Sequence, residues 1–451
     1  MSQNRTSTLK SMGAQASPTN RLDKSARRAM FASTLGTLIE WYDYALYGVA
    51  AGLIISPLFF PSAQPGTGVL LAFATFAVGF VVRPIGGLII AHLGDTIGRK
   101  PAMILTIVLM GAATTGIGLL PTAEQIGVWA AVLLVVLRAI QGFGAGAELS
   151  GALTVAAEFT PDSRQGFFTG IINGVAAGGT AVAQLAFLAV IALPDDALYS
   201  WGWRVPFLFS AVLFVLALWI RNKLEESPEY LAAKESTETK KEKGIPLTAV
   251  FKESPRKAVL SIILWTGHNA NIYVILTFSL GYMTSSIGMP LQSAILVCVV
   301  ANVLGCLISP LWGMIGDRFG HRKVYALVMV FAALWAMPLF MMMQSGNVKL
   351  AFVALLIGSV VTLGGTSGTA GAVTTEIFPA EFRYSGVAAA KEINAAVIAG
   401  PTPFIATALI AVAGGGTWLA AIYIIVCCLV TIYALHALDK IMKKEPANVA
   451  A

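Results

Sequence analysis

The sequence GDTIGRK at residues 94–100 returns in a related form, GDRFGHRK, at residues 316–323. The two copies begin 222 positions apart (316 − 94), and each lies between long apolar stretches. A glutamate followed by a proline and an arginine also repeats, as Glu158, Pro161 and Arg164 and again as Glu376, Pro379 and Arg383. Self-similarity at this distance predicts two bundles of like topology within one chain.

The composition places the chain in a membrane. It has 57% hydrophobic and 12% charged residues and a mean hydropathy of +0.76, which does not fit a soluble globular domain. A helix needs about 20 apolar residues to cross the hydrocarbon core. We therefore predict an all-α integral membrane protein with twelve transmembrane helices in two six-helix bundles. The predicted spans are 30–55, 68–92, 102–121, 127–148, 165–192, 204–221, 256–284, 290–313, 324–343, 350–374, 384–412 and 417–437.

Small residues are concentrated in two of these spans. Glycine at such spacing lets helices approach closely in lipid, where packing replaces the hydrophobic effect as the driving force. The clusters are Gly142, Gly144, Gly146 and Gly151 in the first half and Gly364, Gly365, Gly368 and Gly371 in the second.

The positive charges predict the orientation. Of the 30 Lys and Arg residues, three lie inside predicted spans and two border loops on the far side, which leaves 25 on the side of the termini. The positive-inside rule makes that side the cytoplasm, so both termini are expected there. The net charge of +7 is then a determinant of topology in the lipid bilayer, and we expect no nucleic-acid partner.

The charge pattern also divides the chain. We predict a disordered cytoplasmic tail that is not a cleaved signal, two bundles joined by a cytoplasmic linker rich in Lys and Glu, and a short tail. The boundaries are 1–25 for the first tail, 26–221 for the N-terminal bundle, 222–255 for the linker, 256–438 for the C-terminal bundle and 439–451 for the last tail.

Neither an enzyme nor a metalloprotein is expected. The four cysteines fall in predicted spans without metal-ligand spacing, so we predict packing roles, no metal and no cofactor. Residues 94–100 lack the Walker spacing, and no nucleophile stands with a base at a recognisable spacing. Two fused halves with a carboxylate inside a span favour a carrier over a channel, and a sensor that kept a carrier fold is a further alternative.

Several motifs resemble those of the major facilitator superfamily over the whole chain after the N-terminal tail. They are the loop at 94–100 with its copy at 316–323 and RAIQGFGAG at 138–146. Three more, EWYDY at 40–44, RPIGG at 83–87 and WGWRVPF at 201–207, resemble the metabolite:proton symporters. That family includes carriers of shikimate, 2-oxoglutarate, citrate, proline and betaine.

The resemblance implies the major facilitator fold, alternating access and proton-coupled uptake of a small-molecule substrate across the cell inner membrane. FRYSG at 382–386 and PFIA at 403–406 are most similar to shikimate-type carriers, which favours a small hydroxylated or keto carboxylic acid. Proton-coupled uptake of an osmolyte, proline or glycine betaine, is the alternative. Only residues 438–451 follow the last predicted span, which we expect leaves no room for the coiled coil of some osmosensing members. We expect the protein to function as a monomer.

Asp43 and Glu40, three residues apart in the first span, are the predicted proton-coupling groups, and for Glu40 a purely structural pairing is the alternative. A charge inside a span costs about 2.5–3.5 kcal/mol on insertion scales, so each charged residue there is expected to have an ion-pair partner or a function in transport. Arg138 in the fourth span is the predicted partner, because its planar fork can hold a carboxylate of the protein or of the substrate. We expect protonation of Asp43 to free Arg138 for an anionic substrate; a permanent ion pair is the alternative.

The predicted substrate-binding residues are Arg138, Arg83, Tyr47, Asn269, Asn271 and Lys391. Arg83 can instead brace the cytoplasmic gate, and Lys391 can instead extend to the headgroups. Lys391 and Glu392 are adjacent, so we expect that they cannot face one cavity equally. His268 and Asn394 are further cavity candidates, although a lone histidine in a helix is often simply hydrogen-bonded.

The repeated loop is expected to act as a cytoplasmic latch. Its glycines allow a tight turn, and its aspartates can cap a neighbouring helix and accept bonds from the nearby arginines. The alternative is that the repeated loop only keeps positive charge on the cytoplasmic side and so determines the topology. The predicted gating residues are Gly94, Asp95, Arg99, Lys100, Glu158, Arg164, Asp317, Arg322, Glu376 and Arg383.

Overall fold

The computed structural model describes residues 24–61, 63, 65–97, 99–146, 164–222, 255–378 and 383–444, and these are helical apart from short turns. The long helices of the N-terminal half are α1 (Lys24–Ala50), α3 (Pro65–Ile97), α4 (Arg99–Leu119), α6 (Val128–Ala145), α8 (Gln165–Val190) and α10 (Arg204–Asn222). Short segments are the π-helical turns η1 (Ala51–Ile55) and η3 (Leu198–Gly202) and the helices α2 (Ser56–Phe59), α5 (Ala123–Ile126) and α9 (Asp195–Ala197).

The C-terminal half repeats this arrangement, with spans that are more often interrupted by π-helical turns. Its seventh span runs through α13 (Pro255–Leu264), α14 (Thr266–Tyr273), η4 (Val274–Phe278), α15 (Ser279–Gly281) and η5 (Tyr282–Ser286). The others are α16 (Leu291–Phe319); α17 (His321–Gln344); α18 (Val348–Ile357) with η6 (Gly358–Leu363) and α19 (Gly364–Thr375); α20 (Arg383–Asn394) with η7 (Ala395–Ala399) and α21 (Thr402–Val412); and α22 (Trp418–Lys444).

The predicted spans agree with this arrangement. Ten described helices are long and apolar enough to cross a membrane, a bent pair of helices in the first span makes an eleventh, and Ile104–Leu119 is a shorter apolar helix. The bend of 47° separates Ser33–Ala50 from Leu53–Phe59. Pro57 lies in the second of these helices and has no amide hydrogen to donate to the carbonyl of Leu53, four residues earlier, which favours a bend there. Helix α22 continues to Lys444, beyond the predicted end at 437.

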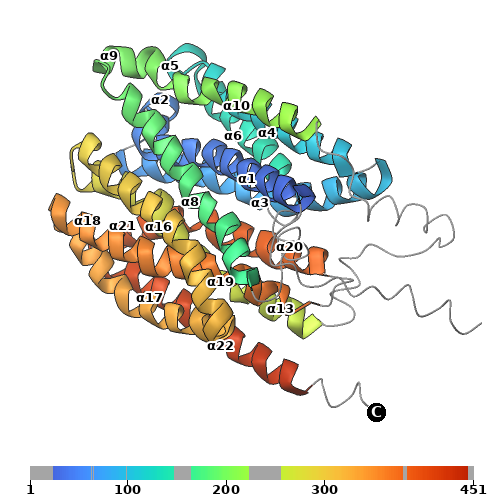
Figure 1. The fold of residues 1–451 in the computed structure, drawn as a ribbon. Coiled ribbons are helices and arrows are strands. Elements are labelled where there is room, and N and C mark those ends of the chain that lie inside the picture. The colour runs from blue at the N-terminus through green and yellow to red at the C-terminus, as the bar shows by residue number, and fades with distance from the viewer. Residues whose placement is uncertain are drawn as a thin grey trace, which may run out of the picture.

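Figure 1 shows the two halves side by side, with α1 and α13 beginning and α22 ending at the same end of the bundle. An even number of crossings requires this arrangement of the ends. That this end faces the cytoplasm remains a prediction from the positive charges. The predicted tail 1–25 and the linker 222–255 lie almost entirely outside the described residues. Of the predicted last tail, residues 439–444 belong to α22, and residues 445–451 lie outside the described residues.

Apolar side chains cover the outer surface of the bundle. Val215 is 61% exposed and Leu334 73% exposed, as expected for side chains that face lipid. Inside the N-terminal half, glycines bring backbones together as predicted: a Cβ atom on Gly142 would lie 1.9 Å from the Gly79 carbonyl oxygen of α3. Packing of this closeness fixes α6 against α3.

Helices α8 and α16 form the tightest contact between the two halves, which we call the glycine interface. A Cβ atom on Gly313 of α16 would lie 2.1 Å from the Gly166 carbonyl oxygen of α8. The Ser309 hydroxyl donates to the Gly170 carbonyl at 3.0 Å, and Asn302 donates to Gln184 at 3.0 Å. The glycine interface therefore closes along most of the length of both helices.

Candidate functional site

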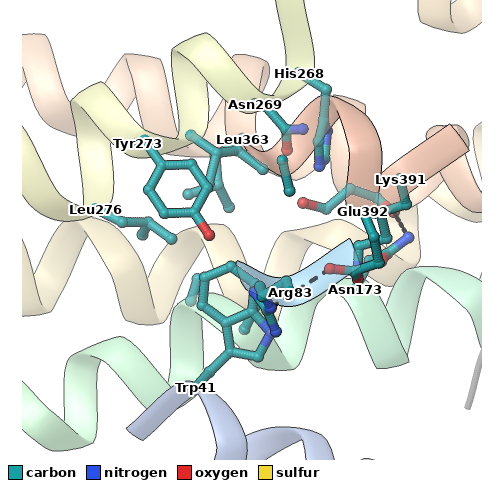
Figure 2. Close-up of a pocket in the computed structure, with 15 residues that line it drawn as sticks. Trp41, Arg83, Asn173, His268, Asn269, Tyr273, Leu276, Leu363, Lys391 and Glu392 are labelled. Carbon is teal, nitrogen blue, oxygen red and sulfur yellow. Dashed lines mark hydrogen bonds and ion pairs between the residues drawn. The ribbon is translucent and has the colours of Figure 1, made fainter. Parts of the chain in front are cut away.

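A small cavity lies between the two halves, at the centre of the bundle (Figure 2). Its volume is about 30 Å³, which is enough for about two water molecules and far below the roughly 300 Å³ at which ligand pockets begin. In this conformation the central cavity therefore has room for water molecules but not for a larger solute. Its polar and charged lining residues are Arg83, Asn173, His268, Asn269, Ser367, Lys391 and Glu392, with Trp41 and Tyr273 on its aromatic side.

Arg83 joins the two halves beside this cavity. Its guanidinium binds the Glu40 carboxylate of α1 through Nη2 and lies 3.4 Å from Oε2 of Glu392 on α20 through Nε. Figure 2 shows Arg83 and Glu392 directed toward each other, with Lys391 next to them. We call Arg83, Glu40, Glu392 and Lys391 the charged interface. All four side chains are buried, so their mutual attraction is only weakly screened by solvent.

Lys391 is 8% exposed and lines the cavity, so in this conformation its amine does not extend to the headgroups. Its neighbour Glu392 lines the same cavity. Successive helical residues are only about 100° apart, so both can border one opening. The expectation that the two do not face the cavity equally stays a prediction. The sequence reveals their depth in the span but not the direction from which the other half approaches.

The asparagines of the seventh span separate into two roles. Asn269 lines the cavity and donates to Asn394 at 2.7 Å, and Asn394 in turn donates to Thr266 at 2.9 Å. Asn271 instead donates to the Gly267 carbonyl at 2.7 Å and to the Cys428 sulfur at 3.2 Å, toward α22. In this conformation Asn271 therefore does not line the central cavity, so its role in binding substrate stays a prediction, and Asn394 supports Asn269.

His268 lines the cavity and packs edge-on against Trp265, with ring centroids 4.8 Å apart. Its Nδ1 atom is buried and has no hydrogen-bond partner within the described part of the chain. The state of Nδ1 therefore does not support the alternative, in which His268 is simply hydrogen-bonded. An imidazole nitrogen directed to a cavity can bind a polar group of a solute.

Arg138 does not lie on the cavity. It donates to the Phe76 carbonyl at 3.2 Å and to Oε1 of Gln141, and its guanidinium stacks on Tyr47 with 4.2 Å to the ring centroid. Among the described residues, no carboxylate forms an ion pair with Arg138, so the predicted pairing with Asp43 is absent in this conformation. The link is indirect: Gln141 donates to the Asp43 backbone carbonyl at 3.2 Å.

Tyr47 is also removed from the predicted substrate site. It is fully buried, bonds to Thr75 and covers one face of Arg138. Aromatic faces and carbonyl oxygens stabilise Arg138 in place of a carboxylate. The predicted binding residues therefore divide into Arg83, Asn269 and Lys391, which the structure brings together, and Arg138, Tyr47 and Asn271, which it does not.

Asp43 faces a second cavity, of about 20 Å³, within the N-terminal half. This cavity lies between α1, α4 and α10, and Glu40 lines it as well. The Ser210 hydroxyl of α10 faces the Asp43 carboxylate. Asp43 is 3% exposed, and its Oδ1 atom has no hydrogen-bond partner among the residues described.

The second copy of the repeated loop forms the predicted helix cap. The Asp317 carboxylate accepts from the Gly166 amide at 2.8 Å and the Phe167 amide at 3.1 Å, at the beginning of α8 in the other half. Its ion-pair partner is His321 at 3.2 Å, not Arg322 as expected. Because α8 begins in the N-terminal half, this cap joins the halves at the end of the glycine interface.

Arg322 acts within the C-terminal half instead. It pairs with Glu376 at 3.2 Å and with Asp439 of α22 at 2.6 Å. Arg164 is exposed at the beginning of α8. The remaining gating candidates lie outside the residues or side chains that the structure describes: Gly94, Asp95, Arg99, Lys100, Glu158 and Arg383.

Three cavity residues were missed by the sequence analysis. Trp41 of α1 lines the cavity opposite Tyr273, with ring centroids 6.0 Å apart. Asn173 of α8 donates to the Ser367 carbonyl of α19 at 3.2 Å, and both residues line the cavity. A polar residue within an otherwise apolar span was the available signal for Asn173; Trp41 carried none beyond its motif.

The comparisons with known proteins agree on one family. Residues 29–391 match the family model for the Major Facilitator Superfamily. The shikimate transporter of Escherichia coli K12 is 37% identical over 408 residues, covering 90% of this chain and 93% of the relative. The proline/betaine transporter of the same organism is 33% identical over 397 residues, covering 86% of this chain and 78% of the relative.

Solved structures match the fold. A partially occluded, inward-open xylose transporter of E. coli superposes with a TM-score of 0.70 at 16% identity, covering 93% of this chain and 98% of that one. A proton:xylose symporter bound to 6-bromo-6-deoxy-D-glucose gives a TM-score of 0.71 at 17% identity, covering 92% and 95%. Likeness at this identity shows the fold alone. The chain belongs to the major facilitator superfamily, and it is a multi-pass inner-membrane transporter rather than an enzyme.

Proposed function

We propose that this transporter takes up a small organic acid together with protons by alternating access. The substrate class is a hydroxylated or keto carboxylic acid of the shikimate type. The observation that carries the proposal is the lining of the central cavity, which presents the cations of Arg83 and Lys391 beside the hydrogen-bonding groups of His268, Asn269 and Asn173. Cations bind the carboxylate, and the neutral groups suit hydroxyl or keto oxygens.

The balance of buried charge supports proton coupling. Among the described residues, the buried aspartate, glutamate, lysine and arginine side chains are three acidic and three basic, so their charges cancel when all six are ionised. A bound monoanion would add one negative charge in a region of low dielectric, where an unpaired charge is costly. One proton on a carboxylate restores neutrality. The six residues are Glu40, Asp43, Arg83, Arg138, Lys391 and Glu392.

The charged interface supplies the mechanism for opening. Arg83 and Glu392 lie on opposite halves, and their ion pair favours the closed arrangement around the central cavity. When a substrate carboxylate binds Arg83, or a proton neutralises Glu392, that attraction weakens and the halves can rock. The cap that Asp317 of α16 forms at the beginning of α8, together with the Arg322 network, would act as gating contacts at the end of the bundle.

The two curated relatives favour different substrates, and the shikimate transporter is the more similar by identity. Uptake of an osmolyte, proline or glycine betaine, is the second candidate. The facing rings of Trp41 and Tyr273 favour it, because aromatic faces bind a quaternary or secondary ammonium. A zwitterion, unlike a monoanion, leaves the buried charge unchanged.

Uptake into proteoliposomes tests the proposal. Labelled shikimate, 2-oxoglutarate, citrate, proline and glycine betaine are offered with and without an inward proton gradient. We expect gradient-stimulated uptake of one acid and little uptake of the zwitterions. Uptake of proline or betaine would move the protein to the osmolyte function, and uptake that is indifferent to the gradient would contradict proton coupling.

A further inference from the structure

The second cavity lies apart from the central one, inside the N-terminal half. Its walls come from α1, α4 and α10, whereas the central cavity is lined by residues of α1, α3, α8 and the C-terminal half. Among the described lining residues, only Glu40 and Asp43 are ionisable, and the rest of the wall is apolar or glycine. A solute that binds in the central cavity does not need this space.

The cavity extends from Asp43 in one direction. Gly36 precedes Asp43 by about two turns of α1, toward the helix beginning, and Ile107 lies nearer the beginning of α4 than Gly111 does. Ala217 lies nearer the end of α10 than Phe214 does. Those ends of α1, α4 and α10 are on the side that the positive charges assign to the cytoplasm. The cavity therefore runs from Asp43 toward the cytoplasmic side.

Two carboxylates connect this cavity with the charged interface. Asp43 presents a buried Oδ1 atom without a hydrogen-bond partner in the described part of the chain. Glu40 lines the same cavity and also binds Arg83, which reaches Glu392 of the other half at 3.4 Å. The side chains that face Asp43 are Glu40 from its own helix and Ser210 from α10; the described α4 wall, with Ile107, Met110 and Gly111, has no charge.

We propose that this second cavity is the exit route of the coupled proton, separate from the route of the substrate. The proposal rests on the proposed function, because it assigns a path to the proton that enters with the acid. In the step, the O–H bond of the Asp43 carboxylic acid breaks, a water molecule in the cavity accepts the proton, and Asp43 becomes a carboxylate. The negative charge of the Asp43 carboxylate then stabilises the guanidinium of Arg83 in its position near Glu40. The ion pairs of the charged interface form again.

A variant that fills the cavity tests the route. Ala217→Leu places a larger side chain in the wall nearest the cytoplasmic end, and Val215→Leu on the lipid-facing side of the same helix is the matched control. We expect Ala217→Leu to lower gradient-driven net uptake by about tenfold or more, because in a blocked cavity no water molecule accepts the proton of the Asp43 carboxylic acid. Counterflow exchange, which needs no proton release, should stay within about twofold of the unmodified protein, as should both activities of the control.

A cysteine at position 217 allows the cavity to be filled after the protein has folded, so that a folding defect cannot explain the result. Ala217→Cys is reconstituted first and then treated with a small thiol reagent, with the treated unmodified protein as the reference for the four native cysteines. A pH-sensitive dye in the lumen follows proton arrival directly. Labelling should slow proton arrival while counterflow continues.

The outcomes separate the two proposals. If the filled or labelled protein lost net uptake and counterflow equally, or lost neither, the separate proton route would be overturned. Proton coupling itself would not be affected by that result. If uptake by the unmodified protein were indifferent to the gradient, the proposed function would fail, and the route with it.

Discussion

The glycine interface and the charged interface, both of which join the halves, differ in chemistry. The glycine interface of α8 and α16 is built from backbone approach, with Gly313 and Gly166 too close for any added atom. The charged interface holds Arg83 between Glu40 and Glu392. A proton can change the charge of a carboxylate, but it cannot change a contact between glycine and a carbonyl group. We therefore propose that protonation acts on the charged interface, while the glycine interface fixes the geometry around which the halves move.

Removing the cation from the charged interface should have the largest effect on stability. Arg83→Ala leaves Glu40 and Glu392 buried without their guanidinium, and breaking a buried pair costs about 3–5 kcal/mol. The free energy of unfolding in detergent measures the loss. Arg164→Ala, at an exposed arginine of the same half, is the control. A loss below about 1 kcal/mol, as for exposed pairs, would mean that the charged interface does not hold the halves together.

Filling the glycine interface should have the next largest effect. In Gly313→Ala the new Cβ atom would lie 2.1 Å from the Gly166 carbonyl oxygen, so the helices must separate. Overpacking of this kind costs about 1–3 kcal/mol. Gly66→Ala is the matched control, because a Cβ atom there would meet nothing within 4 Å. Equal unfolding free energies for the two variants would contradict the account of a tightly closed glycine interface.

The cap at the end of the glycine interface should have the smallest effect. Asp317→Ala removes the acceptor of the Gly166 and Phe167 amides, and loss of a helix cap costs about 0.5–2 kcal/mol. Asp317→Asn keeps an oxygen acceptor and should lose less. Denaturant unfolding compares the two, and a larger loss for Asn than for Ala would show that the contact is not a cap.

The fold followed from local features of the sequence. Twelve apolar stretches and the repeat at 94–100 and 316–323 predict two bundles, because the length of a span and the side of its charges are local properties. The bend after α1 was missed, although Pro57 marks it. The cap by Asp317 was predicted because aspartate suits the beginning of a helix in either half.

The site followed from the sequence only in part. The depth of Asp43, Arg138 and Arg83 in their spans was readable, but the direction in which each side chain points was not. Arg138 is held by Gln141 and aromatic rings, so it needs no carboxylate, and it is Arg83, not Arg138, that lies between two carboxylates. Rotation about the helix axis depends on packing between distant segments, which a hydropathy pattern does not contain.

The accumulation ratio of the transported acid in proteoliposomes tests the central claim, that a proton carried on Asp43 drives the acid inward. With an inward gradient of one pH unit and no membrane potential, symport of one proton with one monoanion permits about tenfold accumulation, since a pH unit corresponds to 1.36 kcal/mol. The account predicts that the unmodified protein approaches this ratio, while Asp43→Asn gives a ratio near one with counterflow preserved. Gradient-driven accumulation by Asp43→Asn equal to that of the unmodified protein would contradict it.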